Sequence, residues 1–64
     1  DHIALSLQKA IASLPEKQKL VFNMRYYQEM PYAQMSEILD TSEGALKTSY
    51  HLAIQKLKKY LTSN

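Results

Sequence analysis

The amino-acid sequence predicts an all-α domain of four helices. Only one glycine and two prolines occur in 64 residues, so the residues that most often form turns are scarce. Strong helix formers such as Leu, Ala, Lys, Gln, Glu and Met supply much of the chain. Apolar residues also recur at spacings of three and four, which is the period of one helix face.

The first helix is predicted from an apolar stripe that ends before a proline. Its members are Ile3, Leu7, Ala10, Ile11 and Leu14. Leu14 precedes Pro15, and a residue before proline is pushed out of the helical region. Pro15 in turn suits the first turn of a second helix, where its missing N–H costs nothing.

The second helix carries apolar residues on two faces. Leu20, Met24 and Tyr27 share one side, whereas Phe22 and Tyr26 share another. We therefore predict that this helix is central and is packed from two directions.

The third and fourth helices are separated by Asp40, Thr41 and Ser42. After the break at Met30-Pro31, a short third helix of about two turns is predicted from Tyr32, Met35, Ile38 and Leu39. Ser42 is the best N-cap candidate for the fourth helix, because its hydroxyl can accept from a backbone N–H of the first turn. The apolar stripe of this helix is formed by Leu46, Tyr50, Ala53, Ile54, Leu57 and Leu61.

These last two helices meet the steric demands of a helix-turn-helix. The small Ser36 stands where the helices cross, and Asp40 stands in the turn, where a positive φ is needed that Asp adopts more readily than most residues. Apolar anchors are expected at Met35, Leu39 and Leu46. Thr41 fits less well, because an apolar residue is usual there. Any αα-hairpin shares this spacing, so the pattern alone leaves DNA binding open.

Length and composition narrow the class of protein. A chain of 64 residues buries only about 60% of its unfolded surface, which excludes a large enzyme with a deep cleft. Cysteine is absent from the sequence, and neither a membrane span nor a signal-peptide pattern is recognisable. These features predict one soluble, cytoplasmic domain over residues 1–64, without membrane insertion.

Catalysis is not expected. His2 and His51 have no partner at metal-ligand spacing, and no glycine-rich phosphate loop is present. Glu37 and Asp40 on adjacent turns are more simply a surface pair than an acid/base couple. The sequence therefore predicts a protein that is not an enzyme and needs no metal or cofactor.

Charge is distributed unevenly along the chain. The formal net charge is +2, but residues 1–43 contain four basic and six acidic side chains, whereas residues 44–64 contain four lysines and no acid. A final third with only positive charge is typical of a surface that faces a polyanion, and a solvated lysine face is the common alternative.

Three segments resemble the promoter-reading C-terminal domain, region 4, of bacterial sigma factors of the extracytoplasmic-function type. They are LPEKQKLVF at residues 14–22, MPYAQMSEIL at 30–39 and SEGALKTSYHLA at 42–53. The resemblance covers roughly residues 10–61. It implies a region 4-like helix-turn-helix, unrelated to winged-helix folds, and a chain that is a fragment of a larger sigma factor.

The chain departs from the family pattern at five positions. Arginine is frequent in the family where this sequence has Ser49, Leu52 and Ile54. Phosphate anchoring by arginine on the fourth helix is therefore weakened or transferred to lysine. Glu29 and Asp40 stand where the family often has glycine.

The resemblance implies sequence-specific binding of the fourth helix in the major groove of the minus-35 promoter element during transcription initiation. It also implies docking on RNA polymerase core through the flap of the β subunit, with an anti-sigma protein as a further partner. The alternative is a protein-interaction module that binds the flap or an anti-sigma factor and has little DNA affinity of its own. A third reading is the related DNA-binding domain of response regulators, which usually dimerises.

Candidate DNA contacts follow from a helical projection of the fourth helix. Its amino-terminal part is expected to read bases, through Glu43, Gly44, Lys47, Thr48 and His51. Backbone contacts are expected from Tyr32, Gln34, Gln55, Lys58 and Lys59. For Lys47 and His51 a solvated surface side chain is the plain alternative. For Tyr32 packing is an equal alternative, and Tyr50 is better explained as core than as a base-stacking platform.

Overall fold

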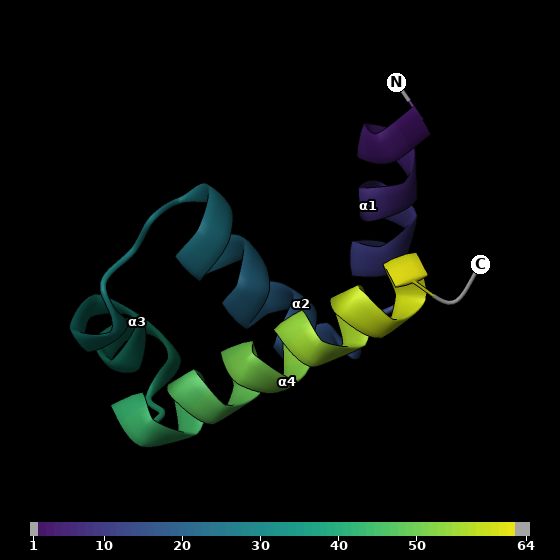
Figure 1. The fold of residues 1–64 in the computed structure, drawn as a ribbon. Coiled ribbons are helices and arrows are strands. Elements are labelled where there is room, and N and C mark those ends of the chain that lie inside the picture. The colour runs from purple at the N-terminus through teal and green to yellow at the C-terminus, as the bar shows by residue number, and fades with distance from the viewer. Residues whose placement is uncertain (1, 63–64) are drawn as a thin grey trace.

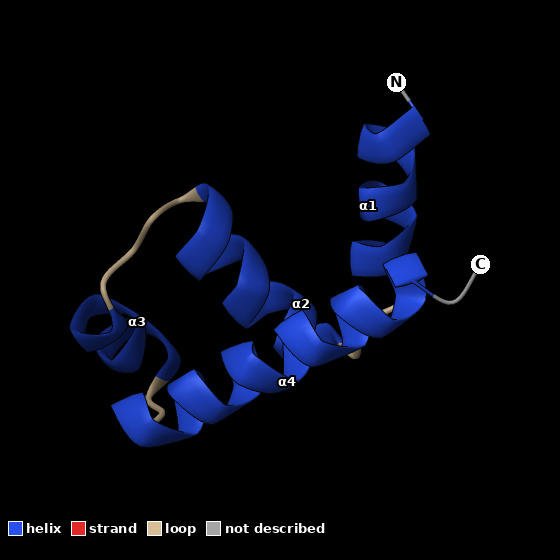
Figure 2. Ribbon diagram, in the orientation of Figure 1, coloured by secondary structure: helices blue, strands red, loops and turns tan. Residues whose placement is uncertain are grey.

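The structure of the chain is a computed structural model that describes residues 2–62, with side chains described from residue 4 onward. It contains, in chain order, α1 (His2–Ala12), α2 (Glu16–Phe22), a π-helical segment η1 (Asn23–Tyr27), α3 (Tyr32–Leu39) and α4 (Glu43–Thr62). All regular structure within residues 2–62 is helical (Figure 2). The predicted all-α class with four helices is therefore confirmed. None of the described helices is long and apolar enough to cross a membrane.

The long helix α4 is the platform on which the other helices lie. It contacts α1, α2 and α3. Figure 1 shows α3 beside the amino-terminal end of α4, α1 beside its carboxy-terminal half and α2 between them. This arrangement spreads the chain over 37 × 19 × 15 Å and leaves one side of α4 uncovered.

The first helix ends at Ala12, two residues before the end predicted at Leu14. The Ser13 hydroxyl donates to the Ala10 carbonyl at 2.6 Å, and the Leu14 N–H donates to the Ile11 carbonyl at 3.1 Å. These bonds tighten the last turn, and Pro15 then takes an extended conformation, with φ −55° and ψ 149°, as the N-cap of α2. The side chain of Ile3, the first member of the predicted stripe, lies outside the described residues.

The second helix does not continue as a regular α-helix. After Phe22 it widens into η1, in which the Gln28 N–H donates to the Asn23 carbonyl at 3.2 Å. Glu29 then adopts a positive φ of 51°, and the Met30 N–H donates to the Met24 carbonyl at 3.0 Å. The hydrogen bond to the fifth residue back shifts the side chains that follow relative to α-helical spacing.

The core consists of two clusters of buried side chains. The α1 cluster comprises Ala10, Ile11, Leu14, Phe22, Ala53 and Leu57. The α3 cluster comprises Val21, Met24, Met35 and Leu46. Tyr50 packs against both clusters. Because Phe22 belongs to one cluster and Val21 to the other, the prediction that the second helix is packed from two directions is confirmed. The predicted central position is wrong, because it is α4 that contacts α1, α2 and α3.

Five residues of the predicted stripes prove to be exposed. They are Leu20, Tyr26, Tyr27, Ile38 and Leu61, each with between 42% and 57% of its surface accessible. Tyr26 and Tyr27 turn outward because the π-helical segment rotates them away from the α-helical register. Ile38 and Leu61 lie near the carboxy-terminal ends of α3 and α4. Leu5 and Leu52, which lie off the predicted stripes, are exposed as well.

Candidate nucleic-acid interface

The turn between α3 and α4 depends on a left-handed aspartate. Asp40 has φ 50° and ψ 47°, and its N–H donates to the Ser36 carbonyl. The Thr41 N–H reaches the same carbonyl at 3.3 Å, while the Thr41 hydroxyl donates to the Leu39 carbonyl at 3.0 Å. These bonds satisfy carbonyls that the end of a helix leaves without partners. The positive φ predicted for Asp40 is confirmed, and Thr41 contributes its hydroxyl where an apolar side chain is usual.

The start of α4 is capped by Ser42. The Ala45 N–H donates to the Ser42 hydroxyl oxygen at 3.2 Å, and this satisfies one of the free donors of the first turn. Glu43 follows as the acidic residue of that turn, where a negative charge is favourable. The N-cap prediction is confirmed, so α4 begins at a defined residue.

Apolar anchors set the crossing of α3 and α4. Met35 and Leu46 are fully buried in the α3 cluster, and Leu39 packs against them. Ser36, the small residue at the predicted crossing, is half-buried. All three predicted anchors therefore pack where a helix-turn-helix requires them.

This crossing leaves the predicted contact face open. The five candidate base-reading residues are all exposed: Glu43, Gly44, Lys47, Thr48 and His51. Of the candidates for backbone contact, Gln34, Gln55, Lys58 and Lys59 are exposed, and Tyr32 is half-buried. All of them except Tyr32 and Gln34 belong to α4. Whether these residues contact DNA stays a prediction.

The described structure does not require a glycine at position 44. A Cβ built on Gly44 would meet no atom within 4 Å, and its φ is not positive. Packing inside the described chain therefore does not require glycine at this position.

Thr48 is engaged by its own helix. Its hydroxyl donates to the Gly44 carbonyl at 3.1 Å, a bond common for Thr within helices. The oxygen therefore presents its lone pairs outward, and the methyl group shares the exposed surface.

Tyr32 brings two cations together at the edge of this face. The Arg25 guanidinium carbon lies 4.8 Å from the centroid of the Tyr32 ring, and the Lys47 ammonium lies 5.7 Å from the same centroid. Arg25 is not among the residues whose function is predicted from sequence. No periodic pattern links a residue of η1 to one across the loop, so only the folded chain reveals this contact.

Tyr50 lies beneath the same region. Its ring stacks on Phe22 with centroids 5.8 Å apart, and it packs against both core clusters. Burial is the main cause that raises the pKa of the Tyr50 hydroxyl above 10.0; Tyr32 also raises it, and Arg25 opposes the shift. The assignment of Tyr50 to the core rather than to base stacking agrees with this packing.

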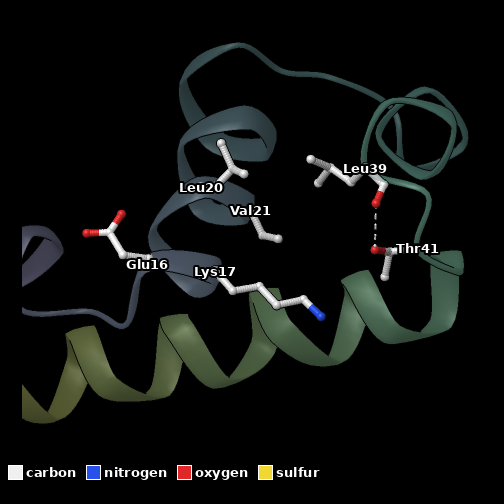
Figure 3. Close-up of a pocket in the computed structure, with 6 residues that line it drawn as sticks. All are labelled: Glu16, Lys17, Leu20, Val21, Leu39 and Thr41. Atoms are coloured by element: carbon white, nitrogen blue, oxygen red, sulfur yellow. Dashed lines mark hydrogen bonds between the residues drawn. The ribbon is translucent and has the colours of Figure 1, made fainter.

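A separate apolar groove lies between α2 and the turn before α4. It has a volume of about 420 Å³ and is lined by Glu16, Lys17, Leu20, Val21, Leu39 and Thr41. Figure 3 shows Leu20, Val21 and Leu39 on facing sides of it, with Lys17 extending along the edge that borders α4. This groove is not predictable from the sequence pattern, because its two walls come from different helices.

Together the capped α4, the left-handed turn and the buried anchors define a helix-turn-helix domain. Comparison with known proteins agrees with this class. The family model described as sigma-70, region 4, matches residues 4–57, and the chain belongs to that family. This membership supports a DNA-binding role as part of a sigma factor, and the family is not one of enzymes.

The chain is also similar to a named sigma factor. The chain is 32% identical over 56 residues to the ECF RNA polymerase sigma factor SigW of Bacillus subtilis (strain 168). The match covers 88% of this chain and 30% of the relative. The chain therefore spans about a third of that protein's length.

Proposed function

We propose that this chain is the promoter-reading domain of a sigma factor and that α4 enters the major groove of the minus-35 element. The observation that carries the proposal is the exposed first half of α4, presented by a turn at Asp40 whose geometry suits a helix-turn-helix. In this arrangement the amino-terminal turns of α4 face base edges.

Base reading falls to five residues of α4: Glu43, Gly44, Lys47, Thr48 and His51. Lys47 donates to guanine O6 or N7, and Glu43 accepts from the cytosine amino group. Thr48 offers lone pairs and a methyl group. Gly44 lets the helix backbone approach the groove wall, because nothing in the described chain fills the space above it.

Phosphate contacts surround the reading face. Lys58 and Lys59 lie farther along α4 with Gln55, while Tyr32 and Gln34 lie in the first turn of α3. Each lysine that neutralises a phosphate steepens the dependence of log K on log salt by about 0.9. These residues hold the domain on DNA without choosing a sequence.

Two lysines of α4 test the division between base reading and phosphate contact. We expect Lys47→Ala to cost about 1–3 kcal/mol on the preferred duplex and to relax preference at one base pair. The matched variant Lys58→Ala should weaken binding to all duplexes alike. The measurement is the affinity for a duplex selected from a randomised pool and for each of its single base-pair variants. Equal losses on every duplex for Lys47→Ala would remove it from base reading.

We also propose that the chain is one domain of a longer, cytoplasmic sigma factor that needs no cofactor. It matches only 30% of its relative, and that relative is named as an RNA polymerase sigma factor. Docking on the β flap of polymerase core would place α4 at the promoter. Copurification of the parent protein with polymerase core tests this assignment.

A second function, as a protein-interaction module, is favoured by the apolar groove. Leu20 keeps 48% of its surface exposed at the groove, which suits an apolar side chain of the polymerase flap or of an anti-sigma protein. Leu20→Glu should weaken binding to a flap fragment, whereas Leu5→Glu, an exposed leucine of α1, should not. Strong, steeply salt-dependent binding of the isolated chain to a promoter would count against this function as the main one.

A further inference from the structure

The contact between Tyr32 and Lys47 restricts where the Lys47 side chain lies. Tyr32 is half-buried against the α3 cluster, so its ring has a restricted position. Lys47 is exposed, and an exposed lysine without a neighbour samples many rotamers. Its ammonium nevertheless lies over the Tyr32 ring, 5.7 Å from the centroid. An attraction between a cation and an aromatic face acts at this distance.

Arg25 also contacts the Tyr32 ring. Its guanidinium carbon lies 4.8 Å from the Tyr32 centroid, and its Nη1 donates to the Met30 carbonyl at 3.1 Å. The Met30 N–H in turn donates to the Met24 carbonyl at 3.0 Å. The ring is therefore tied to the π-helical segment, to the loop that follows it and to α3.

We propose that Tyr32 is a positioning residue for Lys47 and that it sharpens the base preference of α4. The inference rests on the proposed function, because it takes Lys47 as a base-reading residue. A lysine that is already restrained loses less conformational freedom when it reaches a base edge. It is also kept from reaching alternative acceptors on neighbouring base pairs. The ring face performs this role, so the Tyr32 hydroxyl is not required for it.

Two substitutions at Tyr32 separate the ring from the hydroxyl. Tyr32→Phe keeps the aromatic face, and Tyr32→Leu removes it while retaining apolar bulk. We expect Tyr32→Leu to reduce discrimination about two- to fivefold, the strength of an exposed cation–π contact, at the base pair that Lys47→Ala relaxes. Tyr32→Phe should keep the preference of the unmodified chain. In the double variant Tyr32→Leu/Lys47→Ala, discrimination should fall no further than in Lys47→Ala.

The measurement is the set of affinities of the 64-residue chain for the selected duplex and its single base-pair variants at low salt. If Lys47→Ala relaxes one base pair but Tyr32→Leu leaves that preference intact or weakens all duplexes equally, the positioning role is overturned and the proposed function stands. A uniform loss of affinity in Tyr32→Phe would report only the phosphate contact of the hydroxyl. If Tyr32→Phe instead relaxes the same base pair as Tyr32→Leu, the hydroxyl and not the ring face holds Lys47, and the inference also fails. If Lys47→Ala weakens binding to all duplexes equally, Lys47 does not read a base. In that case the proposed role of Lys47 fails, and the inference fails with it.

A measurement without DNA tests the contact directly. Protons beside the Lys47 ammonium should show an upfield ring-current shift in NMR spectra of the chain. The shift should persist in Tyr32→Phe and vanish in Tyr32→Leu, with a circular dichroism melt to verify that each variant folds. Random-coil shifts for these protons in the unmodified chain would overturn the inference even if Tyr32→Leu proved unstable.

Discussion

The rings of Phe22 and Tyr50 stack with centroids 5.8 Å apart and planes 17° apart. Phe22 is buried at the end of α2, and Tyr50 lies in α4 between the two core clusters. Tyr26 stacks on Phe22 as well, at 5.2 Å. These stacked rings join the π-helical segment to the helix that carries the candidate DNA contacts, so their packing sets the position of α4.

Tyr50 should make the free energy of unfolding depend on pH in the alkaline range. Burial raises the pKa of its hydroxyl above 10.0 in the folded chain, so the unfolded chain loses this proton first as pH increases. The contribution of the group is present below about pH 10 and is lost as pH rises through the folded pKa. We expect the free energy of unfolding to fall more steeply above pH 10 in the unmodified chain than in Tyr50→Phe. Denaturant titrations from pH 8 to pH 11 measure the difference, and parallel curves would contradict it.

Replacing Gly44 should change the stability of the chain and its DNA affinity in opposite directions. Because a Cβ there meets open space, Gly44→Ala should stabilise the isolated chain by up to about 1 kcal/mol through helix propensity. The same methyl should weaken DNA binding if the first turn of α4 approaches the groove wall. Unfolding in denaturant and duplex affinity should therefore change in opposite directions. Unchanged or improved affinity would show that the glycine has no part in the interface.

The left-handed residues should respond oppositely to glycine and alanine. Asp40 and Glu29 have φ of 50° and 51°, a region that glycine occupies without steric cost. Asp40→Gly and Glu29→Gly should each raise the free energy of unfolding by up to about 1 kcal/mol. Asp40→Ala should lower it, because alanine keeps the Cβ and enters the left-handed region less readily than aspartate does. Thermal melts of the variants measure the effect, and a stabilising alanine would refute this reason.

Among the leucines in the amino-terminal half of α4, Leu46 should lose the most stability when it is replaced by alanine. It is fully buried in the α3 cluster, so Leu46→Ala should cost about 2–5 kcal/mol, a large share of the stability of so small a chain. Leu52→Ala is the matched control, since Leu52 is 41% exposed and should change stability by less than about 0.5 kcal/mol. Leu46→Met should cost less than about 1.5 kcal/mol. This variant therefore allows the effect at position 46 to be measured even if Leu46→Ala does not fold. Similar losses at the two leucines would contradict the assigned core.

Residue type and spacing were enough to predict the class of fold and the turn. The stripes of α1 and α4, the proline breaks, the Ser42 cap and the positive φ of Asp40 are local properties. They depend on backbone preference and on neighbours three or four residues away. For the same reason the exposed face of α4 could be projected from sequence, although its contact with DNA stays a prediction.

The tertiary structure decided what helical periodicity leaves open. A periodic pattern assumes uniform α-helical geometry, so it placed Tyr26 and Tyr27 in packed stripes, whereas the π-helical segment turns them outward. It also had no means to bring Arg25, Tyr32 and Lys47 together, because they lie on three different elements. Such contacts depend on how the helices cross, and the crossing is set by the whole core at once. Sequence alone therefore determined the helices and the residues open to DNA, and only their packing decided which side chains hold Lys47 in place.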